Sequence, residues 1–241
     1  MKAMSKFWTA LVVGVAVMAV STHSWAVSLS NTNISWSKFT SLADTSSPVG
    51  IPFSDTFIFA GGPKGEITSG VFTGIGDAAG LYVYIYQIKV YSTPPGKVDE
   101  LSIPLLGPGP TTVLVTGVGS VSSFYIGVGD PLDPTDDVPS GFFYGQGNKA
   151  PVGSTFTSPP PVISFSWFNN EVFQGQASYI VGFFSPVLPT TTMANLSDSG
   201  AETKFPLVYT PSPEPSISLL LGAGLLGGII WSRGRKRMKK A

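Results

Sequence analysis

The chain has 241 residues, of which 43% are hydrophobic and only 12% charged, so it has enough apolar side chain to bury a sizeable core and is not intrinsically disordered. Abundant glycine, proline, β-branched and aromatic residues favour strands and turns over helices. There is no cysteine, and the single histidine, His23, lies near the N-terminus in a segment expected to be removed on export. A mature chain without either residue cannot carry a Cys-His or Ser-His-Asp nucleophile system, a thiol redox pair or a usual zinc site.

The formal net charge of zero hides an uneven distribution. Residues 27–212 carry thirteen acidic side chains against six lysines, a net charge of −7, while both ends of the chain are basic. A negatively charged central region repels nucleic acid and anionic lipid, so we expect no nucleic-acid partner.

The N-terminal segment has the features of a signal peptide. Lys2 and Lys6 precede an uncharged run over residues 7–20, and Ser24-Trp25-Ala26 then places small residues where signal peptidase reads them. The alternative is a retained transmembrane anchor, for which the run is short. We predict that signal peptidase removes residues 1–26, cutting between Ala26 and Val27.

Between the two ends, short apolar runs alternate with turn-forming clusters, and no long segment has a period of 3.6 residues. The runs lie at residues 56–60, 81–92, 98–105, 111–116, 121–128, 162–168, 178–184 and 205–209. Many short strands separated by Gly, Pro, Asn and Asp are typical of antiparallel all-β domains. We predict an all-β ectodomain over residues 27–205, an antiparallel β-sandwich or jelly roll, followed by a linker over residues 206–212.

The longest predicted strand, residues 81–91, is apolar on both faces at its start. One face carries Leu81, Val83 and Ile85, and the other carries Tyr82, Tyr84, Tyr86, Ile88 and Val90. Such a strand is expected in the centre of a sheet, with one face in the core between two sheets. The tyrosine row has two interpretations: a packing ladder against neighbouring strands, or an exposed row on which Tyr82, Tyr84 and Tyr86 stack against sugar rings.

One loop concentrates carboxylates, at Asp130, Asp133, Asp136 and Asp137. Hard oxygen ligands on a loop suit calcium, although the spacing does not match an EF-hand. Aspartate and proline also suit tight, solvated turns, so a calcium site and a plain loop both remain open, and no other metal or cofactor is expected.

Glycosidases need only two carboxylates, so the lack of histidine does not exclude that chemistry. The five glutamates beyond the signal peptide are scattered, at Glu66, Glu100, Glu171, Glu202 and Glu214. Nothing in the sequence pairs two of them across a cleft, and we therefore predict no catalytic residues and no enzyme.

The C-terminus has three parts in a fixed order. Pro213-Glu214-Pro215 is followed by an uncharged stretch over residues 216–232 and then by six cations: Arg233, Arg235, Lys236, Arg237, Lys239 and Lys240. As a helix the stretch would span roughly 26 Å, adequate for a ~30 Å hydrocarbon core if the basic side chains snorkel. The cations keep the following end in the cytoplasm, so the ectodomain is expected outside, and the prolines leave Glu214 in an extended, accessible backbone.

This ending resembles the PEP-CTERM sorting signal, in which a Pro-Glu-Pro motif, a hydrophobic helix and a basic cluster are recognised by the membrane enzyme exosortase. The resemblance covers residues 213–241. It implies a Gram-negative host that makes exopolysaccharide, cleavage near residues 213–215, and passage from an inner-membrane precursor to the cell surface or extracellular matrix. The alternative is a simple membrane anchor with a stop-transfer cluster.

Together these features predict an exported, non-enzymatic surface or matrix protein with a structural or adhesive role, associated with exopolysaccharide. Its expected partners are signal peptidase, exosortase and, until processing, the membrane. A lectin-like carbohydrate-binding module is the first alternative, and a glycoside hydrolase is the second.

Overall fold

The computed structural model describes residues 25–59, 62–92, 96–127, 142, 149–198, 201–202 and 205–212. Nearly all regular structure in these residues is β-strand, which confirms the prediction of an all-β domain with antiparallel sheets. Every apolar run named above contributes to a strand.

The elements in chain order are β1 (Trp25–Ser28), β2 (Asn31–Ile34), α2 (Trp36–Thr40), β3 (Ala43–Phe59), β4 (Gly62–Gly74), the 3-10 turn η1 (Gly76–Ala78), β5 (Tyr82–Val90), β6 (Lys97–Val98), β7 (Glu100–Pro104), β8 (Val113–Val115), β9 (Gly119–Val121), β10 (Ser123–Ile126), β11 (Gly153–Ser158), β12 (Val162–Ser166), β13 (Val172–Phe173), β14 (Ile180–Ser185), β15 (Pro189–Met193), β16 (Asn195–Asp198), β17 (Ala201–Glu202) and β18 (Leu207–Pro211).

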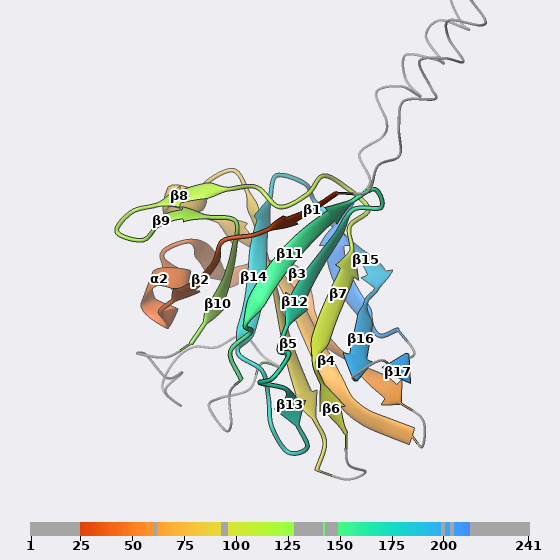
Figure 1. The fold of residues 1–241 in the computed structure, drawn as a ribbon. Helices are drawn as coiled ribbons and strands as arrows, with labels where there is room; N and C mark the ends of the chain where they lie inside the picture. Colours follow the sequence, from red (N-terminus) through yellow and green to blue (C-terminus); the bar gives the residue numbers. More distant parts are fainter. Residues whose placement is uncertain are drawn as a thin grey trace, which may run out of the picture.

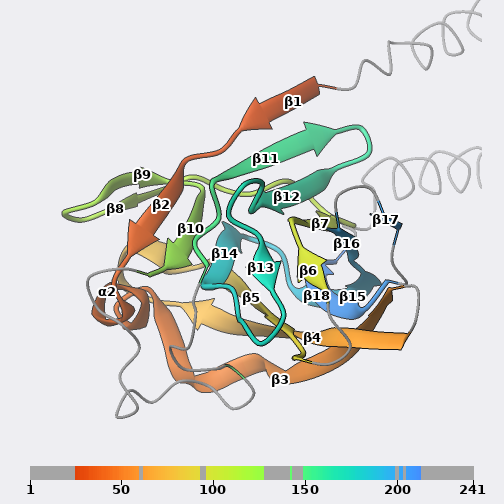
Figure 2. The same ribbon diagram turned by 60° about the horizontal axis from the view of Figure 1, so that its bottom comes forward.

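Two six-stranded sheets form the two layers of the domain (Figures 1 and 2). We call them sheet A, in the order β1-β11-β12-β7-β16-β17, and sheet B, in the order β2-β10-β14-β5-β4-β3. Neighbouring strands are antiparallel except β2 and β10, which are parallel. Three two-stranded ribbons, β6–β13, β8–β9 and β15–β18, complete the described strands.

The first hydrophobic core fills the space between the two sheets. Sheet A contributes Leu101, Ile103, Ile163, Phe165 and Leu196, and sheet B contributes Phe57, Ile67, Val71, Tyr84, Tyr86, Ile88 and Phe183, among others. The tyrosine side of the central strand β5 is therefore the side that faces the other sheet.

A second core lies on the opposite side of sheet B, where β5 presents Val83 and Ile85. The helix α2 and the ribbon β8–β9 cover it. The helix is short but capped, because the Ser35 hydroxyl accepts a hydrogen bond from the Lys38 amide at 3.1 Å, and its buried residues Trp36 and Phe39 are three apart, on one face. The central strand β5 of sheet B is thus buried on both faces.

The chain crosses from sheet A to sheet B between β1 and β2. Serine hydroxyls hold this crossing: the Ser122 amide donates to the Ser30 hydroxyl at 2.9 Å, and the Ser123 and Ser154 hydroxyls share a hydrogen bond of 2.7 Å. Because Ser154 belongs to β11 and Ser123 to β10, this bond ties the two layers together beside the crossing.

The prediction of a linker over residues 206–212 is wrong. Residues 207–211 form β18, which pairs with β15 over five register positions and closes the side of the first core. Val208 and Thr210 are fully buried, and the Thr210 hydroxyl donates to the Pro104 carbonyl at 2.9 Å. Pro206 precedes this strand and Pro211 is its last residue, positions at which a proline does not break the pairing. The folded domain therefore extends through Ser212.

The first and last described residues lie at the same end of the domain. Trp25 pairs with Ser158, beside the turn between β11 and β12, and the Leu105 amide donates to Pro161 in that turn. Gly107, two residues on, lies so close to the Ser212 carbonyl that a Cβ there would be 2.4 Å from its oxygen. In Figure 1 this end is at the top, where β1 begins.

Candidate binding face

Sheet A differs from sheet B because only one of its faces is covered. Along β12, Ile163 and Phe165 point into the first core and are fully buried, whereas Ser164 and Ser166 point outward and are half-buried. Alternation of this kind is expected for an antiparallel sheet with one solvated face.

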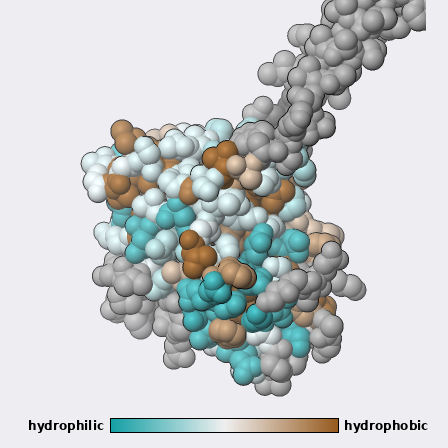
Figure 3. All heavy atoms as spheres, in the orientation of Figure 1, coloured by the Kyte–Doolittle hydropathy of each residue, from teal (hydrophilic) through white to brown (hydrophobic). Residues whose placement is uncertain are grey.

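The strand register aligns the outward positions of sheet A in rows. One row is Thr155, Ser164, Ser102 and Asn195, and the next is Gly153, Ser166, Glu100 and Ser197. The outer face of sheet A is therefore made mainly of small hydroxyl side chains with a carboxylate among them. Figure 3 shows this side of the molecule mostly in pale and teal colours, with scattered brown.

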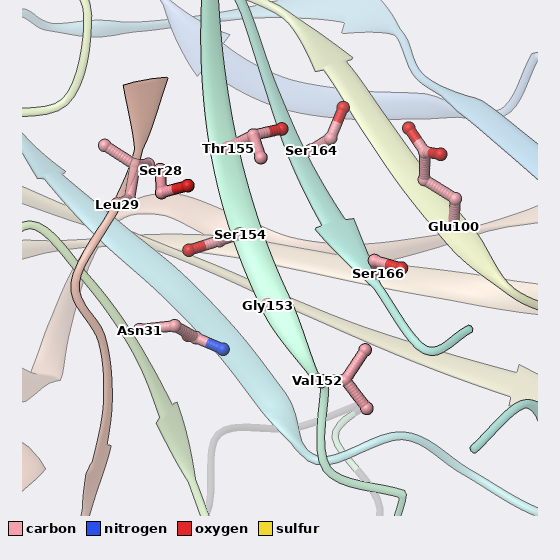
Figure 4. A pocket seen from close by; sticks show the side chains of 10 residues that line it. All are labelled: Ser28, Leu29, Asn31, Glu100, Val152, Gly153, Ser154, Thr155, Ser164 and Ser166. Atoms are coloured by element: carbon pink, nitrogen blue, oxygen red, sulfur yellow. The ribbon is translucent and has the colours of Figure 1, made fainter. Parts of the chain in front are cut away.

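A hollow with a volume of about 670 Å³ opens on this face, beside the point where the chain leaves β1 for β2. Its lining consists of Ser28, Leu29, Asn31, Glu100, Val152, Gly153, Ser154, Thr155, Ser164 and Ser166. In Figure 4, Ser28 and Leu29 stand on one side, Glu100 stands on the other, and Thr155 and Ser164 lie between them. Residues from five strands, β1, β2, β7, β11 and β12, thus meet around one space.

Some polar groups of the hollow are held by the protein. The Ser102 hydroxyl donates to Glu100 Oε1 at 2.6 Å and lies 2.7 Å from the Ser164 hydroxyl. The Phe168 amide donates to the Ser166 hydroxyl at 3.3 Å. These bonds orient Glu100 and the serines, and they leave the second carboxylate oxygen of Glu100 outside the Ser102 bond.

Other polar groups have no partner among the residues that the structure describes. They are the hydroxyls of Ser28 and Thr155 and the Oδ1 atom of Asn31, which is buried. The Asn31 amide nitrogen points toward β11 in Figure 4. Buried polar groups in folded proteins are almost always hydrogen-bonded, so the Asn31 oxygen marks unused hydrogen-bonding capacity. The Ser28 and Thr155 residues beside it are exposed to solvent.

Among the lining residues that the structure describes, Glu100 is the single charged one, and none is a lysine or arginine. Two other glutamates lie elsewhere and are paired: Glu66 with Lys89 at 3.5 Å and Glu171 with Lys97 at 3.7 Å. The hollow is therefore weakly acidic and otherwise neutral.

The structure overturns the interpretation of the tyrosine row as an exposed sugar-stacking surface. Tyr84 and Tyr86 are fully buried, and Tyr82 is half-buried against the first core. The Tyr84 ring stacks on Phe183 with centroids 5.1 Å apart, and the two hydroxyls donate to the Val187 and Tyr209 carbonyls at 2.8 and 2.7 Å. Burial raises the pKa of both tyrosines, and the packing-ladder interpretation is confirmed.

The predicted signal cleavage bond lies inside a paired strand. Ala26 and Val27 belong to β1, where they face Thr157 and Phe156 of β11. Cleavage between them would leave two of the four β1 residues on the edge of sheet A.

The remaining predicted sites lie outside the described residues. They are the aspartate loop (Asp130, Asp133, Asp136, Asp137), the motif Pro213-Glu214-Pro215 and the basic cluster (Arg233, Arg235, Lys236, Arg237, Lys239, Lys240). Within the part of the chain that the structure describes, no group of three or more acidic or histidine side chains is arranged to hold a metal ion. The same part contains no helix long and apolar enough to span a membrane.

No family model, curated protein or solved structure matches the chain. The resemblance of residues 213–241 to a sorting signal therefore stays a prediction.

Proposed function

We propose that the protein is an exported cell-surface or extracellular-matrix component, with a β-sandwich domain carried between an N-terminal signal segment and a C-terminal membrane and sorting segment. Its role is structural or adhesive rather than enzymatic. The observation that supports this most directly is that Trp25 and Ser212 lie at the same end of the domain.

A precursor with apolar segments over residues 7–20 and 216–232 would have both in one bilayer, so its folded domain must begin and end on the side facing that bilayer. The four residue steps from Ser212 to Ser216 span at most about 14 Å, so this part of the chain is too short to pass from one side of the domain to the other. A domain whose ends lay on opposite sides would not fit so short a connection.

The surface chemistry suits display in water. The outer face of sheet A is rich in hydroxyl groups, and the mature region has a net charge of −7, which keeps it away from anionic lipid. Signal peptidase and exosortase are the processing partners on this proposal, and exopolysaccharide is the surrounding material. A lectin-like role is the second candidate, and the polar hollow favours it.

The test is the intact mass of the protein recovered from the envelope and the medium of its native host. We expect a species that begins at Val27 and ends within residues 213–215. A variant with alanine at Pro213, Glu214 and Pro215 should keep residues 233–241, whereas the neighbouring control Ser216→Ala should be processed normally. A wild-type protein that retains residues 233–241 would contradict processing by exosortase, and one that retains residues 1–26 would contradict signal cleavage.

A further inference from the structure

We infer that the hollow on the outer face of sheet A binds an uncharged carbohydrate chain. The inference adds a ligand class to the proposed surface role and rests on that role for its biological setting. The buried Tyr84 and Tyr86 are not among the residues that line the hollow.

The unused groups of the hollow match the chemistry of a sugar. The Thr155 and Ser28 hydroxyls can each donate and accept a hydrogen bond, as each sugar hydroxyl does, and the Asn31 amide offers both functions at one site. The Glu100 carboxylate accepts hydrogen bonds only, and bonds to a charged acceptor are the stronger kind. Because Ser102 already orients this carboxylate, its other oxygen is set to accept from a ligand hydroxyl.

The same lining disfavours other ligand classes. Phosphate, sulfate and uronate groups would meet Glu100, and the described lining residues offer them no lysine or arginine. An extended peptide would find no strand edge at the floor, because the backbones of β11, β12 and β7 already pair with one another. A lipid chain would leave the hydroxyls, the amide and the carboxylate unpaired.

The shape of the hollow is suitable for several sugar rings. Its volume of about 670 Å³ is within the 300–1,000 Å³ range of small-ligand sites. Gly153 keeps the floor open, since a Cβ at this position would meet no atom within 4 Å. Val152, 61% exposed, and Leu29 supply apolar surface at the margin, against which the C–H faces of a sugar can pack.

The hollow is also accessible in a tethered domain. Gly153 and Ser158 are the two ends of β11, and Ser158 lies at the end where Trp25 and Ser212 leave the fold. Five steps along a strand correspond to about 17 Å, so the floor of the hollow is set back from the tethered end by that length. A polysaccharide could reach it without approaching the membrane.

The experiment is isothermal titration calorimetry of the processed protein from its host, and of the full chain in detergent, with cellohexaose, maltohexaose and mannohexaose. An alginate oligomer serves as the charged comparison. We expect millimolar or tighter binding of at least one uncharged hexasaccharide and no binding of the alginate oligomer. Absence of binding to all three uncharged probes, or equal binding of the alginate oligomer, would overturn the inference.

Variants locate the binding. Gly153→Phe should abolish it by filling the hollow, while Thr157→Phe, which points outward from the same strand but lies outside the lining, should leave it unchanged. Glu100→Gln should weaken binding about tenfold, the change expected when a hydrogen bond to a charged group becomes a neutral one. Wild-type affinity in Gly153→Phe, with the fold confirmed by circular dichroism, would place the ligand elsewhere and sink the inference.

The two proposals can fail separately. Normal processing at both ends without sugar binding would leave the export proposal standing and remove the carbohydrate site. Sugar binding by a protein that keeps its C-terminal tail would leave the carbohydrate site standing and contradict processing by exosortase.

Discussion

The strands β5 and β12 are each central in their sheet, yet their surroundings differ. Both sides of β5 are buried, with Tyr84 and Tyr86 in the first core and Val83 and Ile85 in the second. On β12 one side is buried and the other carries the hydroxyls of the hollow. Sheet B therefore works as the internal scaffold of the domain, and sheet A supplies its free polar surface.

The largest effects should come from β5, and they should occur on both of its sides. Tyr86→Ala should lower the free energy of unfolding by about 3–5 kcal/mol and Ile85→Ala by about 2–5 kcal/mol, because each leaves a cavity in a different core. Urea denaturation of the processed protein measures both changes. If either substitution cost under about 1 kcal/mol, one face of β5 would be open rather than buried, and the contrast with β12 would fail.

The sequence predicted β5 well, because a run of β-branched and aromatic residues has one structural outcome whichever way it faces. It did not show which face meets the other sheet, since Tyr and Ile serve equally well in a core. Several of the strands it missed contain proline, glycine or serine, among them β4, β11 and β15. Of β3 it predicted only the end, because the earlier part includes Pro48, Gly50 and Pro52, where the pairing with β4 shifts register. Such residues read as turns when tertiary pairing is unknown.

The hollow was beyond the reach of sequence analysis for a different reason. Ser28, Glu100, Thr155 and Ser164 come from separate strands, and an outward serine near a cavity looks the same in sequence as any other outward serine. The strand register and the β1–β2 crossing bring these residues together, and both are set by long-range contacts. In the sequence, a row of tyrosines suggests sugar stacking because aromatic rings can stack on sugar rings. The same apolar rings also favour burial, and here they are buried.

A smaller effect should separate the strand β18 from a linker. Val208→Thr keeps the shape of the side chain but buries a hydroxyl in the first core, which should cost about 1–3 kcal/mol if no partner is found. The control Leu207→Thr, at the exposed neighbouring position, should change the free energy of unfolding by less than about 0.5 kcal/mol. Equal effects of the two substitutions in urea denaturation would mean that residues 207–211 are a linker rather than a strand packed on the core.

The outward side of β12 should tolerate change that its inward side does not. Ser164→Ala removes one hydrogen bond, to the Ser102 hydroxyl, and should cost about 1 kcal/mol or less. Phe165→Ala, one residue along, should cost about 3–5 kcal/mol by opening the first core. A loss in Ser164→Ala comparable to that in Phe165→Ala, measured by the same denaturation, would show that the outer face of sheet A is part of the scaffold.

The smallest effect concerns the cover over the second core. Asp77 in η1 accepts hydrogen bonds from the Thr116 amide at 2.6 Å and the Thr116 hydroxyl at 3.1 Å, which joins η1 to the end of β8, and Lys38 lies 3.8 Å away. The Thr116 amide in particular, with its hydroxyl and Lys38, holds the pKa of Asp77 below its ordinary value of 3.8.

A carboxyl group whose pKa is lower in the folded chain adds stability above its unfolded pKa and loses that contribution as the pH falls through the folded pKa. Wild-type stability should therefore fall more steeply than that of Asp77→Asn as the pH is lowered below about 4. Thr116→Val loses the hydroxyl but keeps the amide donor, so its curve should lie between the other two. Thermal unfolding followed across this range measures the difference. Parallel curves for all three proteins would mean that the hydrogen bonds of Asp77 do not stabilise the cover. The apolar contacts of β8 and β9 alone would then hold it over the second core, as apolar contacts hold the first core.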